Sequence, residues 1–394
     1  MASNIIQIDE EKVKEHLGKI VSRSVEDTLN ALLDAEADEI CKAQKYERSP
    51  DRIAGRAGHY ERKLMTKAGE VKLKIPKLRK ATFETAIIER YKRRETSVEE
   101  AMIEMYLAGV SVRRVEDVTE ALWGTKVSPG TISNMNKKIY DSIEKWRNEP
   151  LKSHYTYVYL DGIWLKRTWG GEVRNVSILV AVGVNESGYR EIIGVAEGSK
   201  EDKASWCKFL AYLKGRGLEK IDMVISDKCM GLVESIPDYY PEALWQRCVV
   251  HFYRNVFSLV PHNRMKEVAT MLKAVHAQEN REEARKKRDA VASKLKEMKL
   301  SKASELVQSG IDETLSYYVF PVEHWRKIRT NNGLERIMKE IRRRTRVVGS
   351  FPDGESALML VAARLRHIAS STWSEKKYLN MDLMVTVPED EKAS

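Results

Sequence analysis

The chain has 394 residues and a formal net charge of +10, because 68 Lys and Arg outnumber 58 Asp and Glu. A chain of this length is expected to form two to four domains, and the excess positive charge favours a polyanionic partner, nucleic acid ahead of an acidic membrane surface. Four widely separated cysteines argue against a disulfide framework and a four-ligand zinc site. No stretch resembles a signal peptide or a membrane span. We therefore expect a soluble, cytoplasmic protein.

The first 95 residues predict a helix followed by a basic hairpin. Apolar residues recur at helical spacing through residues 10–48, which indicates an N-terminal helical region, residues 1–50, for dimerisation or DNA binding. Residues 51–95 contain two strand-like runs rich in Lys and Arg around a turn at residues 67–70. Such a hairpin is either a binder of DNA phosphates or a basic surface sheet, and its composition fits both equally.

Residues 96–150 predict three short helices. Ser97, Ser111 and Ser128 are suitable N-caps for them. Two helices followed by a third with polar and basic side chains are typical of a helix-turn-helix DNA-binding domain, although three-helix bundles that bind no DNA share this pattern. The DNA contacts predicted on the third helix are Thr131, Ser133, Asn134, Asn136, Lys137 and Lys138.

After Pro150 the pattern becomes α/β. Three apolar strand-like runs, an amphipathic helix and two further strand-like runs predict a mixed sheet of the ribonuclease H type. Residues 256–325 interrupt this pattern with helix, and 13 of the 22 residues from 279 to 300 are charged, as in a solvated helix. We predict an α/β domain in two parts, 151–255 and 326–375, with an all-helical insertion at 256–325 and a disordered tail at 376–394.

Two of the predicted strands end in an acid, Asp161 in the first and Asp227 in the fourth. The carboxyl ends of strands meet at one edge of an open α/β sheet, so we expect both carboxylates in one crevice. Adjacent carboxylates repel each other unless a cation lies between them, and oxygen ligands suit Mg²⁺ or Mn²⁺. The alternative is that each Asp caps a turn, and for either Asp alone that is the better explanation.

A third acid, Glu335, stands near the start of a predicted helix at residues 331–346. A Glu in the first turn is often only a partner of the helix dipole, but this one is followed by many basic residues. A helix with one inward acid and a basic flank is able to hold a metal ion and the DNA backbone together. The DNA-binding residues predicted on this helix are Arg336, Lys339, Arg342, Arg343, Arg344 and Arg346.

Three long segments resemble the mutator-type family of bacterial insertion-sequence transposases. They are YVYLDGIWLKR around Asp161, VISDKCMGLVESIPDYYPEALWQRCVVHFYRN around Asp227, and IRTNNGLERIMKEIRRRTRVVGSFP around Glu335. The resemblance covers residues 50–370. The acids are 66 and 108 residues apart, with the helical insertion inside the second gap, as in the family. One departure is Asn331, where the family often has threonine.

The resemblance implies a DDE transposase that binds terminal inverted repeats and cuts and joins DNA strands, by a copy-out/paste-in pathway. Asp161, Asp227 and Glu335 would be its catalytic, metal-binding acids. Two Mg²⁺ ions, replaceable by Mn²⁺ and about 3.5–4 Å apart, would activate the attacking oxygen and stabilise the leaving oxygen. The implied partners are double-stranded DNA, at the element ends and at the target, and a second copy in a homodimer associated with the bacterial nucleoid.

Cys248 and His251 form a CxxH motif that the family shares. The resemblance gives His251 a supporting role near the scissile phosphate, whereas a packed Cys and a helix-capping His explain the pair equally well, and two ligands do not make a zinc site. Trp325 either stacks on an unpaired base or packs in a helical core, which is the commoner role. Two other functions stay open: a DNA-binding regulator with an inactive α/β domain, and a ribonuclease H-type nuclease that cleaves without strand transfer.

Overall fold

A computed structural model of the chain describes residues 10–88, 93–107, 110, 112–123, 126–128, 130–131, 134–135, 140–169, 172–198, 202–348, 351 and 353–386. The chain divides into two compact units, Met1–Ile139 and Tyr140–Ser394. Within the described ranges, no helix is long and apolar enough to cross a membrane.

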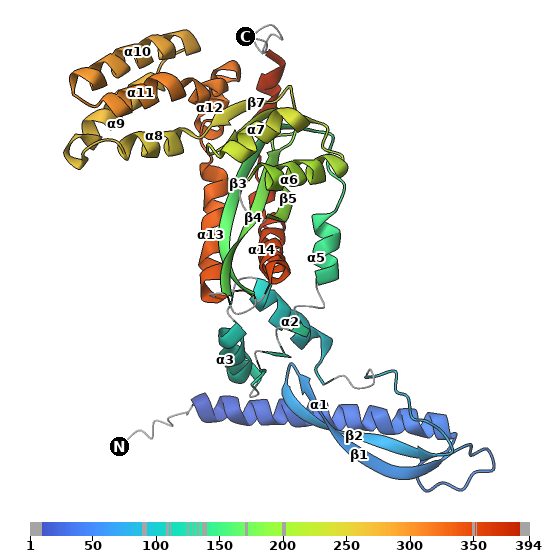
Figure 1. The fold of residues 1–394 in the computed structure, drawn as a ribbon. Coiled ribbons are helices and arrows are strands. Elements are labelled where there is room, and N and C mark those ends of the chain that lie inside the picture. Colours follow the sequence, from blue (N-terminus) through green and yellow to red (C-terminus); the bar gives the residue numbers. More distant parts are fainter. Residues whose placement is uncertain are drawn as a thin grey trace, which may run out of the picture. The chain divides into compact units, whose positions relative to one another are not determined.

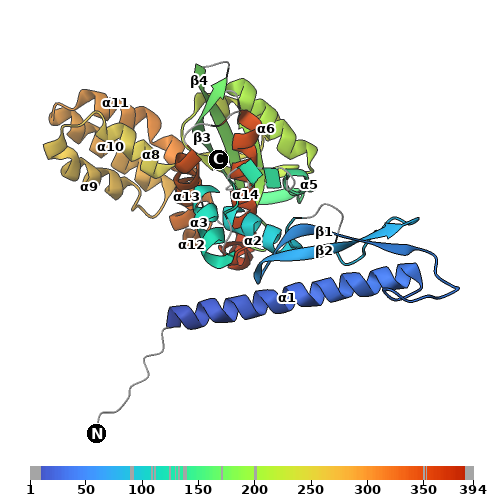
Figure 2. The ribbon, with the colours of Figure 1, turned by 90° about the horizontal axis from the view of Figure 1, so that it is seen from below.

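The first unit begins with a long helix that packs on a two-stranded hairpin (Figures 1 and 2). Its elements are α1 (Glu10–Cys41), β1 (Gly55–Thr66) and β2 (Gly69–Arg79). Along β2, Val71, Leu73 and Ile75 are buried, while Lys72 and Lys74 between them are exposed. Leu29 and Leu33 of α1 pack on the buried face. The predicted helix and hairpin are confirmed. The alternation of buried apolar and exposed basic residues along β2 gives the hairpin one apolar and one basic face.

The rest of the first unit contains α2 (Thr96–Leu107) and α3 (Val112–Trp123), which share a core with Met65 of the hairpin. In the predicted third helix, Thr131 is half-buried and Asn134 is exposed. Its other predicted DNA contacts lie outside the described residues: Ser133, Asn136, Lys137 and Lys138. The helix-turn-helix thus stays a prediction.

The second unit is built on a mixed sheet of five strands in the order β5-β4-β3-β6-β7. β3, β4 and β5 are antiparallel neighbours, while β6 runs parallel to both β3 and β7. The strands are β3 (His154–Trp169), β4 (Glu172–Val184), β5 (Arg190–Gly198), β6 (Lys220–Ser226) and β7 (Leu244–Arg247). This arrangement confirms the predicted mixed α/β sheet.

Helices cover the sheet, with α6 (Lys203–Gly215) and α7 (Met230–Tyr239) packed over Val158 and Leu160 of β3. The opposite face of β3 carries Tyr157 and Tyr159, whose hydroxyls contact the helix α12 (Val322–Ile328). The helices α5 (Tyr140–Arg147), α13 (Asn332–Val348) and α14 (Gly354–Ala369) also belong to this unit. α5 packs on α14, and the division between the two compact units lies at residue 139; the domain boundary at 150 stays a prediction.

A helical region lies to one side of the sheet and has a hydrophobic core of its own (Figures 1 and 2). It confirms the predicted run of helices but begins at Val249 rather than at residue 256, because Phe252 and Val256 already belong to its core. Its elements before α12 are α8 (Val249–Phe257), η1 (His262–Arg264), α9 (Met265–Val275), α10 (Arg281–Glu297), α11 (Ser301–Gly310), η2 (Asp312–Thr314) and η3 (Ser316–Val319).

The C-terminal segment is ordered further than predicted. Tail residues 376–386 include η4 (Met381–Thr386), preceded by the short helix α15 (Thr372–Glu375). Leu379 and Met381 are buried, and the Leu379 amide donates to the Gly188 carbonyl at 3.1 Å. The predicted disorder from residue 376 is therefore wrong for 376–386, because apolar side chains anchor this segment; residues 387–394 lie outside the described part.

Candidate active site

The first two predicted acids come from neighbouring parallel strands. β3 and β6 pair up to Tyr159 and Ile225, and continuing this register by two residues sets Asp161 opposite Asp227. Side chains two residues apart share a face of a sheet, so Asp161 lies on the face of Tyr159. β3 does not end at Asp161 as predicted; it continues to Trp169 because it pairs with β4 over residues 157–169. It is the parallel pairing of β3 with β6 that ends near this point, at Tyr159.

The third acid is brought to these strands by Asn331, which precedes α13 and is fully buried. Its Nδ2 donates to the Leu160 carbonyl at 3.2 Å and its backbone N–H donates to Cys248 Sγ at 3.2 Å. The Glu335 amide donates to the Asn331 carbonyl at 2.9 Å, and the Cys248 amide donates to the Ser226 carbonyl at 2.8 Å. One hydrogen-bonded cluster therefore connects the first turn of α13 with the residues that precede Asp161 and Asp227.

The negative charge of the Glu335 carboxylate is only partly compensated by the side chains around it. Its Oε1 is buried and accepts no hydrogen bond from the described residues. His251 Nε2 lies 3.4 Å from it and Arg254 Nη1 lies 4.0 Å from it. A buried carboxylate oxygen without a hydrogen bond is costly, so this atom fits a site that receives a cation.

Cys248, His251 and Glu335 can bring one ligand atom each within 4.8 Å of one another, and no second group of three such residues is found in the described ranges. Asp161, Asp227 and Glu335 are therefore not gathered that tightly. Burial raises the pKa of the Cys248 thiol, which opposes the thiolate form that zinc requires. Cys248 thus fits the packed role, as an acceptor for the Asn331 amide.

The basic residues of α13 divide between two faces. Arg344 is 3% exposed and lies on the buried side of the helix with Ile337 and Ile341. We therefore do not assign to Arg344 the phosphate contact that the sequence predicts. The helix turns by about 100° per residue, which is why one residue of the cluster turns inward. The basic residues that are exposed are Arg336, Lys339, Arg342, Arg343 and Arg346.

Trp325 packs in the helical region. Its Nε1 donates to the Phe320 carbonyl at 2.7 Å, and its ring meets the Tyr318 ring edge-on, with centroids 4.7 Å apart. These contacts correspond to the core role of the two considered from sequence, and base stacking stays an untested alternative.

Comparisons with known proteins identify the family of this chain. The model of the family described as "Transposase, Mutator family" matches residues 1–375. The chain belongs to this transposase family. Its relatives include the transposase for insertion sequence element ISRM5 of Rhizobium meliloti (strain 1021), 36% identical over 90% of this chain and 89% of the relative. The transposase for IS256 in transposon Tn4001 of Staphylococcus aureus is 33% identical over 97% of both chains. The transposase for IS1081 of Mycobacterium tuberculosis is 37% identical over 90% of this chain and 86% of the relative.

The transposase family implies enzymatic cutting and joining of DNA.

The residues that the sequence did not point to are those that support the candidate acids. Asn331 stood out only as a departure from the family, although it connects three segments of the site. A buried asparagine directly before a helix is a weak signal, because Asn is also a common N-cap. Its partners, Leu160 and Cys248, are distant in sequence, so only the fold reveals them.

Proposed function

We propose that this transposase binds the terminal inverted repeats of an insertion sequence and cuts and rejoins DNA there, with Asp161, Asp227 and Glu335 as its catalytic acids. The observation that carries the proposal is that Asn331 and Cys248 connect the first turn of α13, where Glu335 lies, with the residues directly before Asp161 and Asp227. Turn capping would explain each Asp alone, but it does not explain why a third acid is brought to the same edge of the sheet.

The strand order and directions support a ribonuclease H-like catalytic domain. In this proposal the domain consists of residues 140–248 and 329–375, and the helices between them form an insertion. The first unit would supply DNA-binding regions: α1, the basic hairpin and a helix-turn-helix. These boundaries replace the predicted 150 and 256, because α5 packs on α14 and because α8 belongs to the core of the helical region.

The donor set fits Mg²⁺ or Mn²⁺, because it consists of carboxylate oxygens. The bound ions would make a water or a 3′-hydroxyl a better nucleophile and stabilise the leaving oxygen. Three acids that are not all within 4.8 Å of one another fit two ions better than one. His251, 3.4 Å from Glu335, would orient that carboxylate and face the scissile phosphate.

The exposed basic residues of α13 would bind DNA phosphates, which position DNA without reading its sequence. Sequence recognition would come from the first unit, through Thr131, Asn134 and the predicted contacts outside the described residues, Ser133, Lys137 and Lys138. A homodimer would bring the two ends together, and the copy-out/paste-in pathway would follow.

The test is an assay of full-length protein on an end duplex, with products separated by size. We expect nicked and joined strands with Mg²⁺ or Mn²⁺, and binding without turnover in Ca²⁺. Cleavage undiminished by excess chelator contradicts the metal site. Cleavage without joined product indicates a nuclease, and end binding without any cleavage indicates a regulator.

A further inference from the structure

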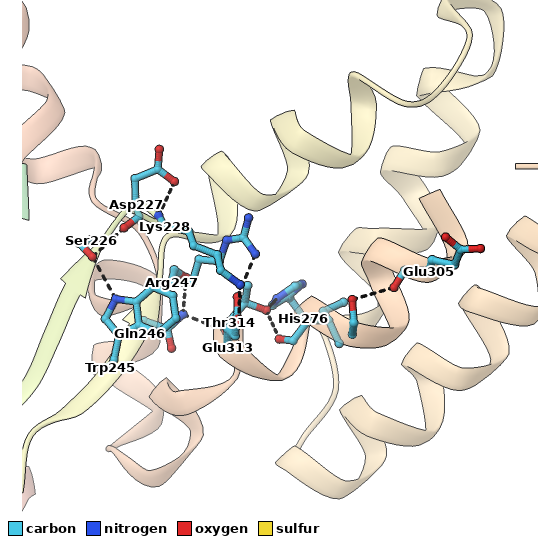
Figure 3. A network of polar contacts seen from close by, with 12 residues as sticks. Ser226, Asp227, Lys228, Trp245, Gln246, Arg247, His276, Glu305, Glu313 and Thr314 are labelled. Carbon is cyan, nitrogen blue, oxygen red and sulfur yellow. Dashed lines mark hydrogen bonds and ion pairs between the residues drawn. The ribbon is translucent and has the colours of Figure 1, made fainter. Parts of the chain in front are cut away.

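Glu313, in η2, forms ion pairs with two cations at the edge of the sheet (Figure 3). Its Oε1 lies 2.5 Å from Lys228 Nζ and its Oε2 lies 2.9 Å from Arg247 Nη1. Lys228 directly follows Asp227, and Arg247 directly precedes Cys248. One carboxylate of the helical region therefore contacts the residues next to Asp227 and Cys248, in two of the chain segments that form the candidate site.

Arg247 fixes this carboxylate in place. It is 3% exposed, it is the register partner of Ser226 in the parallel pairing of β6 and β7, and its guanidinium lies 4.9 Å from the centre of the Phe252 ring. In the described part of the chain, Glu313 is the one carboxylate within ion-pair distance of it. A buried charge is costly without its partner, so the Arg247–Glu313 pair is a fixed part of the fold.

The surrounding contacts continue as far as Asp227. Gln246 Nε2 donates to the Thr314 carbonyl at 2.9 Å, which connects β7 to η2. Trp245 Nε1 donates to Ser226 Oγ at 2.9 Å, and Ser226 Oγ donates to the Asp227 carbonyl at 2.8 Å. Figure 3 shows these contacts as a continuous path from the helical region to the end of β6. The position of Glu313 is thus well defined relative to Asp227.

Lys228 is the more exposed of the two cations that pair with Glu313. Its side chain is 32% exposed, and its backbone N–H already donates to Asp227 Oδ1 at 2.7 Å. A lysine has a flexible four-carbon stem, so its ammonium can turn toward the neighbouring carboxylate when nothing else holds it. An ammonium at Asp227 would compete with a metal cation for the same charge.

We propose that Glu313 is a positioning residue, which holds the Lys228 ammonium away from Asp227 and keeps that carboxylate available to a divalent cation. The inference rests on the proposed role of Asp227 as a metal ligand. Residues that support metal ligands typically change metal affinity by about 10- to 100-fold when they are replaced.

The experiment measures Mn²⁺ binding to the full-length chain by electron paramagnetic resonance, without DNA. We expect E313Q to weaken Mn²⁺ binding about tenfold, and K228Q added to E313Q to restore most of it, because the competing ammonium is gone. K228Q alone should bind Mn²⁺ at least as well as the unmodified chain. K203Q is the matched control, since it breaks the Lys203–Asp238 ion pair of 3.3 Å in the same unit and should change nothing.

A second variant separates this role from stability, because E313Q leaves Arg247 buried without its partner. R247M/E313Q removes both charges of the buried pair, an exchange that proteins often tolerate, and still releases Lys228. It should weaken Mn²⁺ binding like E313Q and be restored by K228Q in the same way. A purely structural role would instead lower the unfolding temperature and leave Mn²⁺ affinity unchanged.

D227N distinguishes failure of this inference from failure of the proposed function. If D227N loses Mn²⁺ binding while E313Q and R247M/E313Q bind normally, the role of Glu313 is wrong and the metal site stands. If Mn²⁺ binding is weakened but K228Q does not restore it, the Lys228 mechanism is wrong. If D227N binds Mn²⁺ like the unmodified chain, the proposed metal site itself is wrong.

Discussion

Single residues in this chain act through the partners that the fold gives them. The register of two parallel strands, continued by two residues, sets Asp161 opposite Asp227. Asn331, which binds the Leu160 carbonyl and Cys248, connects the first turn of α13, where Glu335 lies, to the same strands. Glu335 Oε1 is thereby buried without a hydrogen bond from the described residues. At metal sites, replacing residues that support the ligands typically costs about 10- to 100-fold in metal affinity or activity.

His276 gives a residue-scale prediction for stability against pH. Burial lowers its pKa to about 4, and its Nε2 lies 2.8 Å from Thr314 Oγ1. An unfolded histidine has a pKa of about 6.5, so the unfolded chain binds an extra proton between pH 6.5 and 4. The contribution of neutral His276 to the free energy of unfolding is fully present above pH 6.5 and is lost as the pH falls. Between pH 7.5 and 5 this lowers the free energy of unfolding by about 2 kcal/mol.

Denaturant unfolding of the unmodified chain and of His276→Gln at both pH values checks this. The variant should be less stable at pH 7.5, where it lacks the native contacts, but should show a smaller loss of stability on acidification. An equal loss of stability in both proteins would show that the pKa of His276 does not differ between the folded and unfolded states.

At this scale the sequence predicts the acids but not their supporting residues. Asp161 and Asp227 are found because each follows an apolar run, and Glu335 because it begins a basic helix. Glu313 is one of many carboxylates in a charged helical region, and its partners Lys228 and Arg247 are 85 and 66 residues away. Sequence patterns report local periodicity and contain no signal for such pairs.

Among the elements, α13 combines a buried face with an exposed basic face. Lys339 and Arg343 are exposed four residues apart, so they lie on the same side of the helix. Arg343 pairs with Glu340 of its own helix at 3.2 Å. An exposed pair of this kind contributes little to stability, so these cations are available to DNA.

We expect Lys339→Ala combined with Arg343→Ala to weaken binding to all duplexes alike. The slope of log affinity against log salt should fall by roughly one unit for each phosphate interaction that the substitutions remove, because fewer counterions are released. The matched control is Lys287→Ala with Lys294→Ala, two exposed lysines of α10. An unchanged slope together with a lower unfolding temperature would indicate that the α13 residues serve stability.

The elements also show where periodicity misplaces boundaries. The apolar run before Asp161 predicts a strand end, but β3 continues to Trp169 because β4 supplies hydrogen bonds along its other edge. Disorder is predicted from residue 376 onward, yet Leu379 and Met381 reach buried positions. In both cases contacts with distant residues override the local signal.

On the scale of the whole molecule, two compact units suit a division between recognition and chemistry. The first unit has hydrophobic clusters of its own around α1 with the hairpin and around α2 with α3. Sequence composition predicts both units, since the change from helical and basic segments to α/β segments is visible near residue 150. The shift of the boundary to 139 depends on the packing of α5 on α14, which composition does not encode.

We therefore expect residues 1–139, expressed alone, to protect terminal inverted repeats in a footprinting experiment. Replacement of Lys72 and Lys74 on the exposed face of the hairpin should weaken the protection, because phosphate contacts position the protein on the duplex. A uniform, sequence-independent footprint would place end recognition elsewhere in the chain.

The most direct test of the central claim compares Asp161→Asn, Asp227→Asn and Glu335→Gln in single-turnover cleavage of an end duplex, alongside the affinity of each variant for that duplex. Asp222→Asn is the control, because Asp222 lies on β6, the strand that directly precedes Asp227, but pairs with His154 at 3.2 Å. We predict that the three variants lose cleavage and joining and keep end binding, while the control keeps both. Cleavage at the unmodified rate in any of the three, or loss of end binding as complete as the loss of cleavage in all of them, would contradict the assignment of these acids.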